Sequence, residues 1–170
     1  SNTLTSLTMA TNTGIGVELT GSTTTLSSST ITSPTSYGVR VITGTGNTIS
    51  SNTVDGATGA GVRFESASNP LSGGIVMNTI TGSGVAVTGG AGNTIDSVSI
   101  RTNGGGGVSL SGGTGAIIKY NRIATNTGAG IDIAAAATGS SMTVNTINGN
   151  TGNGVTVGAN STTLLNNTVS

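Results

Sequence analysis

Only ten side chains of this 170-residue chain are charged, and they cancel to a net charge of zero. Histidine and cysteine are absent, which excludes imidazole and thiol catalysis, disulfide bonds and Cys/His metal sites. The chemistry that remains is that of paired carboxylates or of cations that bind an anionic ligand. The acids are Glu18, Asp55, Glu65, Asp96 and Asp132, and the bases are Arg40, Arg63, Arg101, Lys119 and Arg122.

The composition also excludes classes of partner. Without a basic excess the chain is a poor candidate for binding nucleic acid, which depends on Lys and Arg neutralising phosphates. No apolar run approaches the ~20 residues of a membrane span. The 30 glycines, together with Thr, Ser and Asn, fill well over half of the chain, as in disordered linkers. Folding therefore depends on whether the aliphatic residues recur at a fixed spacing.

The aliphatic residues recur in three columns with a period of about 23 residues. Each period begins with Gly followed by Val or Ile, and another apolar residue stands two positions later, which is the alternation of a β-strand. The first column is Val17, Val39, Val62, Val85, Val108, Ile131 and Val155. The second is Leu4, Leu26, Ile49, Ile75, Ile95, Ile118, Met142 and Leu164, and the third is Met9, Ile31, Val54, Ile80, Ile100, Ile123, Ile147 and Val169.

A unit of this length with three short strands has too few aliphatic residues to fold alone. We therefore expect about seven coils that stack, each strand pairing with its equivalent in the next coil at ~4.8 Å. The expected fold is an all-β solenoid with a continuous core, in a single domain of residues 1–170 without evident capping repeats. Residues 65–74 are three longer than their counterparts, which predicts a bulge at that corner.

Asparagine recurs two residues before the third column. Asn tolerates left-handed backbone, and its amide can bond to the equivalent amide of the next coil, so these positions predict a ladder. A second, weaker set follows the third column at Asn12, Asn103, Asn126 and Asn150. The members of the predicted ladder are Asn52, Asn78, Asn121, Asn145 and Asn167.

Segments such as Asn121–Ile131 and Asn145–Val155 resemble the repeats of the pectate-lyase-like superfamily, and the resemblance extends over residues 4–169. It implies a right-handed, three-faced parallel β-helix. The superfamily includes lyases, hydrolases, epimerases, phage tailspikes and surface adhesins, so the resemblance does not by itself assign an activity. Its enzymes that cleave acidic polysaccharides use clustered Asp with Arg or Lys, often with calcium, on one outer face.

The acids of this chain do not predict such a cluster. Glu18 and Asp132 share the outward column between the two apolar residues of the first strand, but five coils separate them, about 24 Å. No other pair of acids is expected to lie closer unless a loop brings it together. We therefore expect no catalytic residue, no metal site and no cofactor.

The bases give two candidate groupings. Arg101, Lys119 and Arg122 lie close in sequence on neighbouring coils and form a possible patch for an anionic glycan. Glu18 and Arg40 occupy successive coils of one column, where they would pair across the coils and scattered charge would only keep a neutral rod soluble. The sequence favours this second interpretation.

A row of hydroxyl side chains precedes the third column and resembles the ice-binding face of β-solenoid antifreeze proteins. Charged residues interrupt it, and Thr is a common outward residue of strands, so ice binding is a lesser alternative. The row is Thr8, Thr30, Thr53, Thr79, Ser99, Arg122, Thr146 and Thr168.

Both terminal coils keep the repeat, and open coils expose apolar side chains and unpaired strands. We therefore expect an extracellular structural protein without enzyme activity. It would be a filament subunit stacked head to tail on copies of itself, or an adhesin stalk continued by flanking coils of a longer chain. The alternative is a carbohydrate-binding or polysaccharide-modifying β-helix. The expected stacking surfaces are Leu4, Leu7 and Met9 at one end and Val155, Val157, Leu164 and Val169 at the other.

The low charge and the absence of Cys are typical of a bacterial cell-surface or secreted product. The expected partners are copies of the chain or flanking coils, with surface glycans as a further candidate. Neither nucleic acid nor a membrane span is expected.

Overall fold

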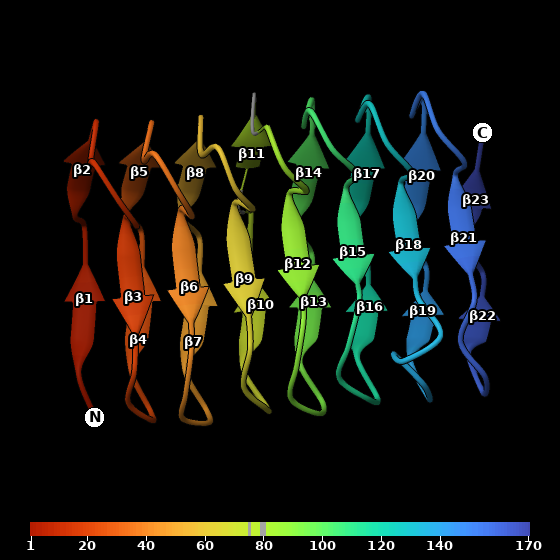
Figure 1. Ribbon diagram of the computed structural model, residues 1–170, viewed down its shortest axis with the longest axis horizontal. Coiled ribbons are helices and arrows are strands. Elements are labelled where there is room, and N and C mark those ends of the chain that lie inside the picture. Colours follow the sequence, from red (N-terminus) through yellow and green to blue (C-terminus); the bar gives the residue numbers. More distant parts are fainter. Residues whose placement is uncertain (75, 79–80) are drawn as a thin grey trace.

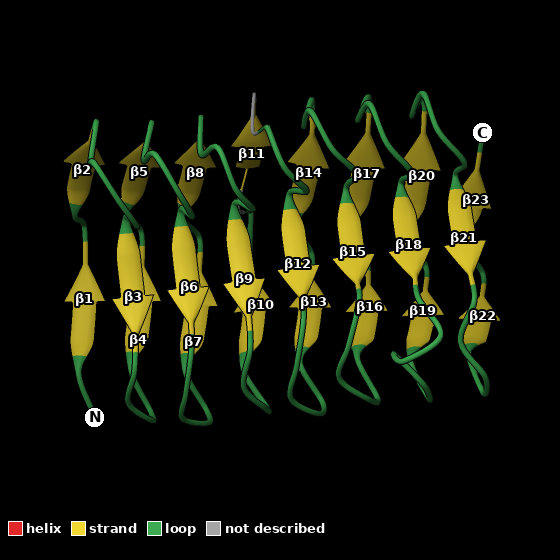
Figure 2. Cartoon of the chain, viewed as in Figure 1, coloured by secondary structure: helices red, strands yellow, loops and turns green. Residues whose placement is uncertain are grey.

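The computed structural model describes residues 1–74, 76–78 and 81–170, and every regular element in these ranges is a short β-strand (Figures 1 and 2). The strands form three parallel sheets that run the length of the molecule. Sheet A contains β1 (Thr3–Thr5), β4 (Thr25–Ser27), β7 (Thr48–Ser50), β10 (Pro70–Ser72), β13 (Thr94–Asp96), β16 (Ile117–Lys119), β19 (Ser141–Thr143) and β22 (Thr163–Leu165). Sheet B contains β2 (Thr8–Ala10), β5 (Thr30–Thr32), β8 (Thr53–Asp55), β11 (Val76–Asn78), β14 (Ser99–Arg101), β17 (Arg122–Ala124), β20 (Thr146–Asn148) and β23 (Thr168–Val169). Sheet C contains β3 (Val17–Leu19), β6 (Val39–Val41), β9 (Val62–Phe64), β12 (Val85–Val87), β15 (Val108–Leu110), β18 (Ile131–Ile133) and β21 (Val155–Val157).

This arrangement confirms the all-β, three-faced parallel solenoid of about seven coils. In Figure 1 the strands of sheet C lie in front and run opposite to those of sheets A and B behind them, and the two termini lie at opposite ends of the long axis. Strands of sheets A and B point their middle residue into the core, whereas strands of sheet C bury their first and third residues. The inward side chains form one continuous aliphatic core, with Phe64 as its largest member.

The register in the fourth coil differs from the sequence prediction. Leu71 pairs with Ile49 and Ile95 in sheet A, and Met77 pairs with Val54 and Ile100 in sheet B. The sequence pattern assigns Ile75 and Ile80 to these columns, and both lie outside the described residues.

The predicted bulge at residues 65–74 is wrong as well. Phe64 and Leu71 are as far apart in sequence as Leu19 and Leu26, so that corner has an ordinary length. The extra residue lies after β10, where Gly73 and Gly74 both have positive φ and extend the turn without steric cost. The prediction was misled because Ile75 and Ile80 are five residues apart, which is the usual step from the second column to the third.

Asparagine side chains tie neighbouring coils together at the turn from sheet A to sheet B. The Oδ1 atom of Asn52 accepts from the Ser29 amide at 2.9 Å, and that of Asn121 accepts from the Val98 amide at 2.8 Å. Asn145 and Asn167 continue the same chain of contacts. Asn78 does not belong to it, because its register position lies opposite Asp55, on the far side of the third column.

Two further Asn ladders stabilise the other turns. Asn47, Asn69 and Asn93 link the coils where the chain enters sheet A, each Oδ1 accepting a backbone N–H of the preceding coil at 2.9–3.0 Å. Sequence reasoning missed this set, although Asn47 and Asn93 stand two residues before the second column, and Asn69 stands two residues before Leu71, which takes that column in the structure. Asn103 and Asn126 lie in a third ladder, before sheet C. Buried backbone donors at the turns therefore have partners from the next coil.

Glycine stands before the first column because the coils touch there. A Cβ on Gly107 would collide with Ile123 Cγ2 and lie 2.6 Å from the Gly130 carbonyl oxygen. The Gly-Val pairs of the sequence thus mark the positions where backbone and core side chains approach most closely.

The predicted stacking residues lie in the terminal coils, where Leu4, Leu7 and Met9 are partly buried against the core. Val155 is also partly buried, whereas Val157, Leu164 and Val169 are exposed to 42–52%. In the residues that the structure describes, no helix is long and apolar enough to cross a membrane.

Candidate functional site

The outer face of sheet C carries most of its charge in the first three coils. In each of these strands the first and third residues are buried, so the middle residue points outward. The middle residues of successive strands lie in register and form a single row along the sheet. This row begins with Glu18, Arg40 and Arg63 and ends with Ser109, Asp132 and Thr156. Repetition of the coil has thus placed three charged side chains on successive strands.

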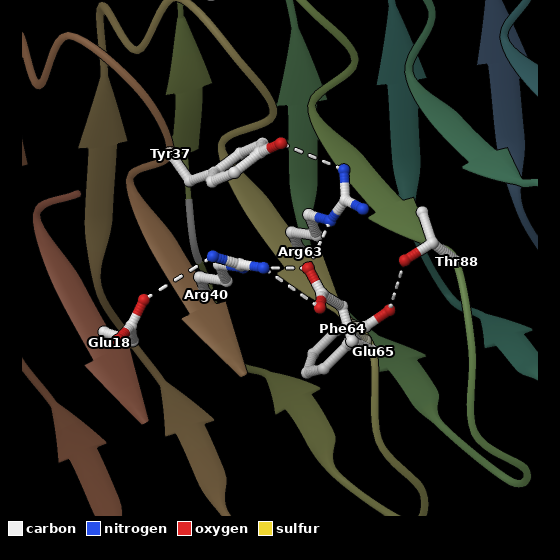
Figure 3. A network of polar contacts seen from close by, with 7 residues as sticks. All are labelled: Glu18, Tyr37, Arg40, Arg63, Phe64, Glu65 and Thr88. Carbon is white, nitrogen blue, oxygen red and sulfur yellow. Dashed lines mark hydrogen bonds and ion pairs between the residues drawn. The ribbon is translucent and has the colours of Figure 1, made fainter. Parts of the chain in front are cut away.

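Around this row lies a network that we call the Tyr37 cluster, shown in Figure 3. Arg40 donates two hydrogen bonds to Glu65, from Nε to Oε1 at 2.8 Å and from Nη2 to Oε2 at 3.1 Å. Arg63 Nε donates to the same Oε1 at 2.6 Å. Glu18 Oε2 lies 3.6 Å from Arg40 Nη1, on the opposite side of that guanidinium. The cluster comprises Glu18, Tyr37, Arg40, Arg63 and Glu65.

Tyr37 lies at the edge of this network, in the turn before β6. Its hydroxyl oxygen accepts a hydrogen bond from Arg63 Nη1 at 3.0 Å. The guanidinium carbons of Arg40 and Arg63 lie 5.7 and 5.1 Å from the ring centroid, within cation–π range. A Cβ on Gly59 would lie 2.8 Å from the ring, so a glycine in the next coil makes room for the tyrosine. The ring is therefore held in place and only partly exposed.

The two arginines fix the charge of Glu65. Its pKa is lowered chiefly by the hydrogen bond from Arg40, against an opposing effect of burial, and further by Arg63. The same contact raises the pKa of Arg40. Glu65 therefore stays ionised near neutral pH and serves as an anchor, whereas the Tyr37 hydroxyl can both donate and accept a hydrogen bond.

The sequence anticipated part of this cluster. The expected contact between Glu18 and Arg40 is present. No other pair of acids was expected to lie closer than Glu18 and Asp132 unless a loop brought it together, and Glu65, which follows β9, is that exception, because it contacts the same guanidinium as Glu18. Glu65 was missed, although strand alternation puts it on the same face as Arg63, two residues earlier, and beside the neighbouring Arg40.

The second grouping of bases lies on the other side of the molecule, at the turn between sheets A and B. Lys119 Nζ is 3.3 Å from Asp96 Oδ2 on the adjacent strand and 5.8 Å from the Tyr120 ring centroid. Arg101 and Arg122 are exposed, and their guanidinium groups make no ion pair with any residue that the structure describes. We call Arg101, Lys119, Tyr120 and Arg122 the Tyr120 patch.

Beside the Tyr37 cluster the surface is hollow, and no group of carboxylates suited to a metal ion lies within the described residues. Within the described ranges, no group of three or more Asp and Glu side chains lies close enough together to hold a metal ion. A hollow of about 450 Å³ adjoins the Tyr37 cluster at the first coils, lined by Leu4, Glu18, Leu19 and Thr24 among others. A ligand on sheet C would therefore meet a concave edge beside Glu18.

Residues 13–169 match the family model described as a right-handed β-helix region. The A-module of the Azotobacter vinelandii mannuronan C-5 epimerase AlgE6 is similar in structure, with a TM-score of 0.85 at 17% identity over 99% of this chain and 51% of that chain. A crystal structure of the periplasmic alginate epimerase AlgG gives 0.79 at 14% identity over 99% and 50%. This chain thus spans about half the length of each. No curated protein sequence matches it significantly.

These similarities confirm the right-handed β-helix and contradict the expected function. The expectation was a filament subunit or adhesin stalk without enzyme activity. The solved structures named above are epimerases of alginate or mannuronan, not fibre proteins, and they favour the alternative of a polysaccharide-modifying β-helix. The prediction took scarce charge as evidence against a site, whereas four of the ten charged side chains meet in one cluster on sheet C.

Proposed function

This chain belongs to the right-handed β-helix family, and we propose that it is a polysaccharide-modifying enzyme whose Tyr37 cluster binds an acidic sugar. The observation that carries the proposal is the convergence of two guanidinium groups, a tyrosine and two carboxylates on one outer face of a chain with ten charged residues. The named epimerases with this fold act on alginate or mannuronan, which supports a uronate polymer as the substrate class.

The cluster retains donors for a substrate carboxylate. A guanidinium has five N–H groups, and Glu65 takes only Nε and Nη2 of Arg40 and Nε of Arg63. Arg63 Nη1 is directed to Tyr37, which leaves Arg63 Nη2 and the loosely paired Arg40 Nη1. Because Glu65 holds both side chains from behind, the free N–H groups are pre-positioned for a bidentate contact with a uronate.

The reaction that suits these groups is proton exchange at the carbon next to the carboxylate. The carbon–hydrogen bond breaks, its electron pair is delocalised into the carboxylate, and a proton returns to the opposite face of the carbon. Arg40 and Arg63 stabilise the negative charge that develops on the carboxylate oxygens. On one face of the carbon a water molecule takes up the proton that leaves, and on the other face the Tyr37 hydroxyl donates the proton that returns and is then reprotonated by solvent.

We also propose that the protein acts outside the cytoplasm, where such polymers accumulate. The structurally similar epimerase AlgG is periplasmic, which supports this location. The partner of the chain would then be a polysaccharide and not a copy of itself.

Deuterium exchange tests the proposal. The chain is incubated with polymannuronate in D2O, and deuterium at C5 and the appearance of the C5 epimer are followed by NMR. The variant Tyr37→Phe keeps the ring on Gly59 and removes only the hydroxyl, so we expect the exchange rate to fall about 100-fold or more. The urea unfolding midpoint of Tyr37→Phe should match that of the unchanged protein, so that a lower rate does not reflect unfolding.

A same-face control is Thr156→Ser, at the far end of the outward row of sheet C. It should leave the exchange rate unchanged. If the unchanged protein neither introduces deuterium into polymannuronate nor binds it, the proposed function is wrong.

A further inference from the structure

The turn between β16 and β17 combines exposed cations with an exposed aromatic ring. Tyr120 is 56% exposed, and Val144, at the equivalent turn of the next coil, is 42% exposed. Tyr120 and Val144 occupy the same turn of adjacent coils, since the Tyr120 amide donates to the Thr143 carbonyl at 3.1 Å. The patch therefore has an apolar floor formed by an aromatic and an aliphatic side chain.

The backbone holds Tyr120 in an unfavourable conformation. Its φ is +56°, in the left-handed region that bulky residues rarely adopt. Equivalent turns carry Ser28, Ser51 and Ser97 with nearly the same φ, and serine makes the turn with a much smaller side chain. Packing does not explain a tyrosine at this position, because more than half of its surface is exposed.

The charge of the patch is unbalanced. Lys119 is paired with Asp96, but Arg101 and Arg122, on the adjacent strands β14 and β17, have no ion-pair partner within the described ranges. Diagonal neighbours on adjacent strands lie about 7–8 Å apart, so the two guanidinium groups can reach separate carboxylates of one extended chain. The local excess is two positive charges on a protein whose net charge is zero.

We propose that the Tyr120 patch is a second, non-catalytic contact for the acidic polysaccharide, in which Arg101 and Arg122 pair with carboxylates and the Tyr120 ring packs on a sugar face. This rests on the proposed function for the identity of the polymer. The patch lies on sheets A and B, away from the Tyr37 cluster on sheet C, so it holds a separate segment of polymer and keeps the protein attached between reaction events. Exposed aromatic and aliphatic surface beside unpaired cations favours a carboxylated sugar chain over a purely phosphate-based partner.

The solenoid supplies conservative substitutions for the test. Arg101→Thr, Tyr120→Ser and Arg122→Thr install the residues that Thr32, Ser97 and Thr146 provide at equivalent positions of other coils. The triple variant should therefore fold as well as the unchanged protein, which its urea midpoint checks. A charge control, Thr5→Glu with Thr30→Glu, changes the net charge equally at exposed positions of the first two coils.

The measurement is the dissociation constant for long polymannuronate immobilised on a sensor, with neutral dextran as the blank. We expect the triple variant to bind about tenfold more weakly and the charge control less than about twofold. Equal losses in both variants, or no loss in the triple variant, would overturn the second contact. If C5 deuterium exchange persists in that case, the proposed function itself stands.

Anionic phospholipid vesicles and double-stranded DNA are the competing occupants. If either binds as tightly as polymannuronate and is lost in the triple variant, the surface is a general anion site and the assignment to a polysaccharide is wrong. Absence of polymannuronate binding by the unchanged protein overturns both this inference and the binding role of the Tyr37 cluster.

Discussion

The Tyr37 cluster and the Tyr120 patch contain the same kinds of side chain but differ in how they are held. In the cluster, Glu65 fixes both guanidinium groups and a glycine accommodates the ring. In the patch, Lys119 is the one cation with an ion-pair partner among the described residues, and the tyrosine is exposed on a strained backbone. The first is pre-organised and nearly neutral, and the second is open and positive.

The difference follows from how the coil distributes charge. On sheet C, opposite charges stand in one outward row on consecutive strands, where β spacing brings them within contact. On sheet B, the strand partners of Arg122 are Ser99 and Thr146, which cannot neutralise it. Pairing orders side chains for chemistry, whereas unpaired charge remains available to attract a polymer.

The largest effects are expected from the glycines beneath each region. A Cβ on Gly38 would collide with Val54 and lie 2.6 Å from the Gly61 carbonyl, and Gly107 is equally crowded. We expect Gly38→Ala and Gly107→Ala each to lower the free energy of unfolding by about 3 kcal/mol, measured by urea denaturation. Because coils contact only their neighbours, hydrogen exchange should rise around Tyr37 in the first variant and around Tyr120 in the second.

Gly14 provides the matched control, since nothing lies within 4 Å of a Cβ placed there. Gly14→Ala should change the stability by less than about 0.5 kcal/mol. Similar losses for all three glycines would show that close approach of the coils is not what requires them.

A smaller effect is expected from the residue that positions the patch. Asn121 stands between Tyr120 and Arg122 and accepts from the Val98 amide while its Nδ2 donates to the Ile95 carbonyl at 2.9 Å. Asn121→Ala leaves buried backbone groups unsatisfied, so we expect a loss of about 2 kcal/mol by urea denaturation. Polymer binding should weaken with it, while deuterium exchange at the Tyr37 cluster persists.

Asn153→Ala is the comparison for that variant, because Asn153 is exposed and makes one side-chain bond, at 3.3 Å. If Asn121→Ala and Asn153→Ala lowered the free energy of unfolding equally, the buried hydrogen bonds of the Asn ladder would not be what stabilises the turn.

The fold that carries the two regions could largely be predicted from the sequence, but the contrast between the regions could not. The columns gave the three sheets and their register outside the fourth coil, because strand alternation fixes which side chains face inward. The cluster was not predicted as a site, because Glu65 follows its strand and Tyr37 precedes one, outside the outward row on which the prediction relied. The strain at Tyr120 could not be predicted either, since backbone φ follows from the stacked turn and not from residue type.

Acid should weaken the Tyr37 cluster. Glu65 has a lowered pKa in the folded state, so its contribution to stability is present above its ordinary pKa of about 4.3 and is lost as the pH falls from there through the folded value. The effect is at most about 1 kcal/mol, because the pair is partly exposed. Urea midpoints between pH 6 and pH 3 should fall more steeply for the unchanged protein than for Glu65→Gln. Parallel curves would contradict the anchoring role of Glu65.

The smallest effect should be a gain, at the strained turn of the patch. Val144 has φ +55°, and a β-branched residue is disfavoured in this region. The next coil has Asn166 at the equivalent turn with the same φ, so Val144→Asn installs a residue that the fold already uses there. We expect a stabilisation of about 0.5 kcal/mol, measured by urea denaturation, because the 42%-exposed valine loses little packing. If the variant is instead less stable and polymer binding is unchanged, Val144 stabilises the fold by packing on Tyr120. The strain of this turn would then be offset by packing within the protein, and no ligand would be needed to explain it.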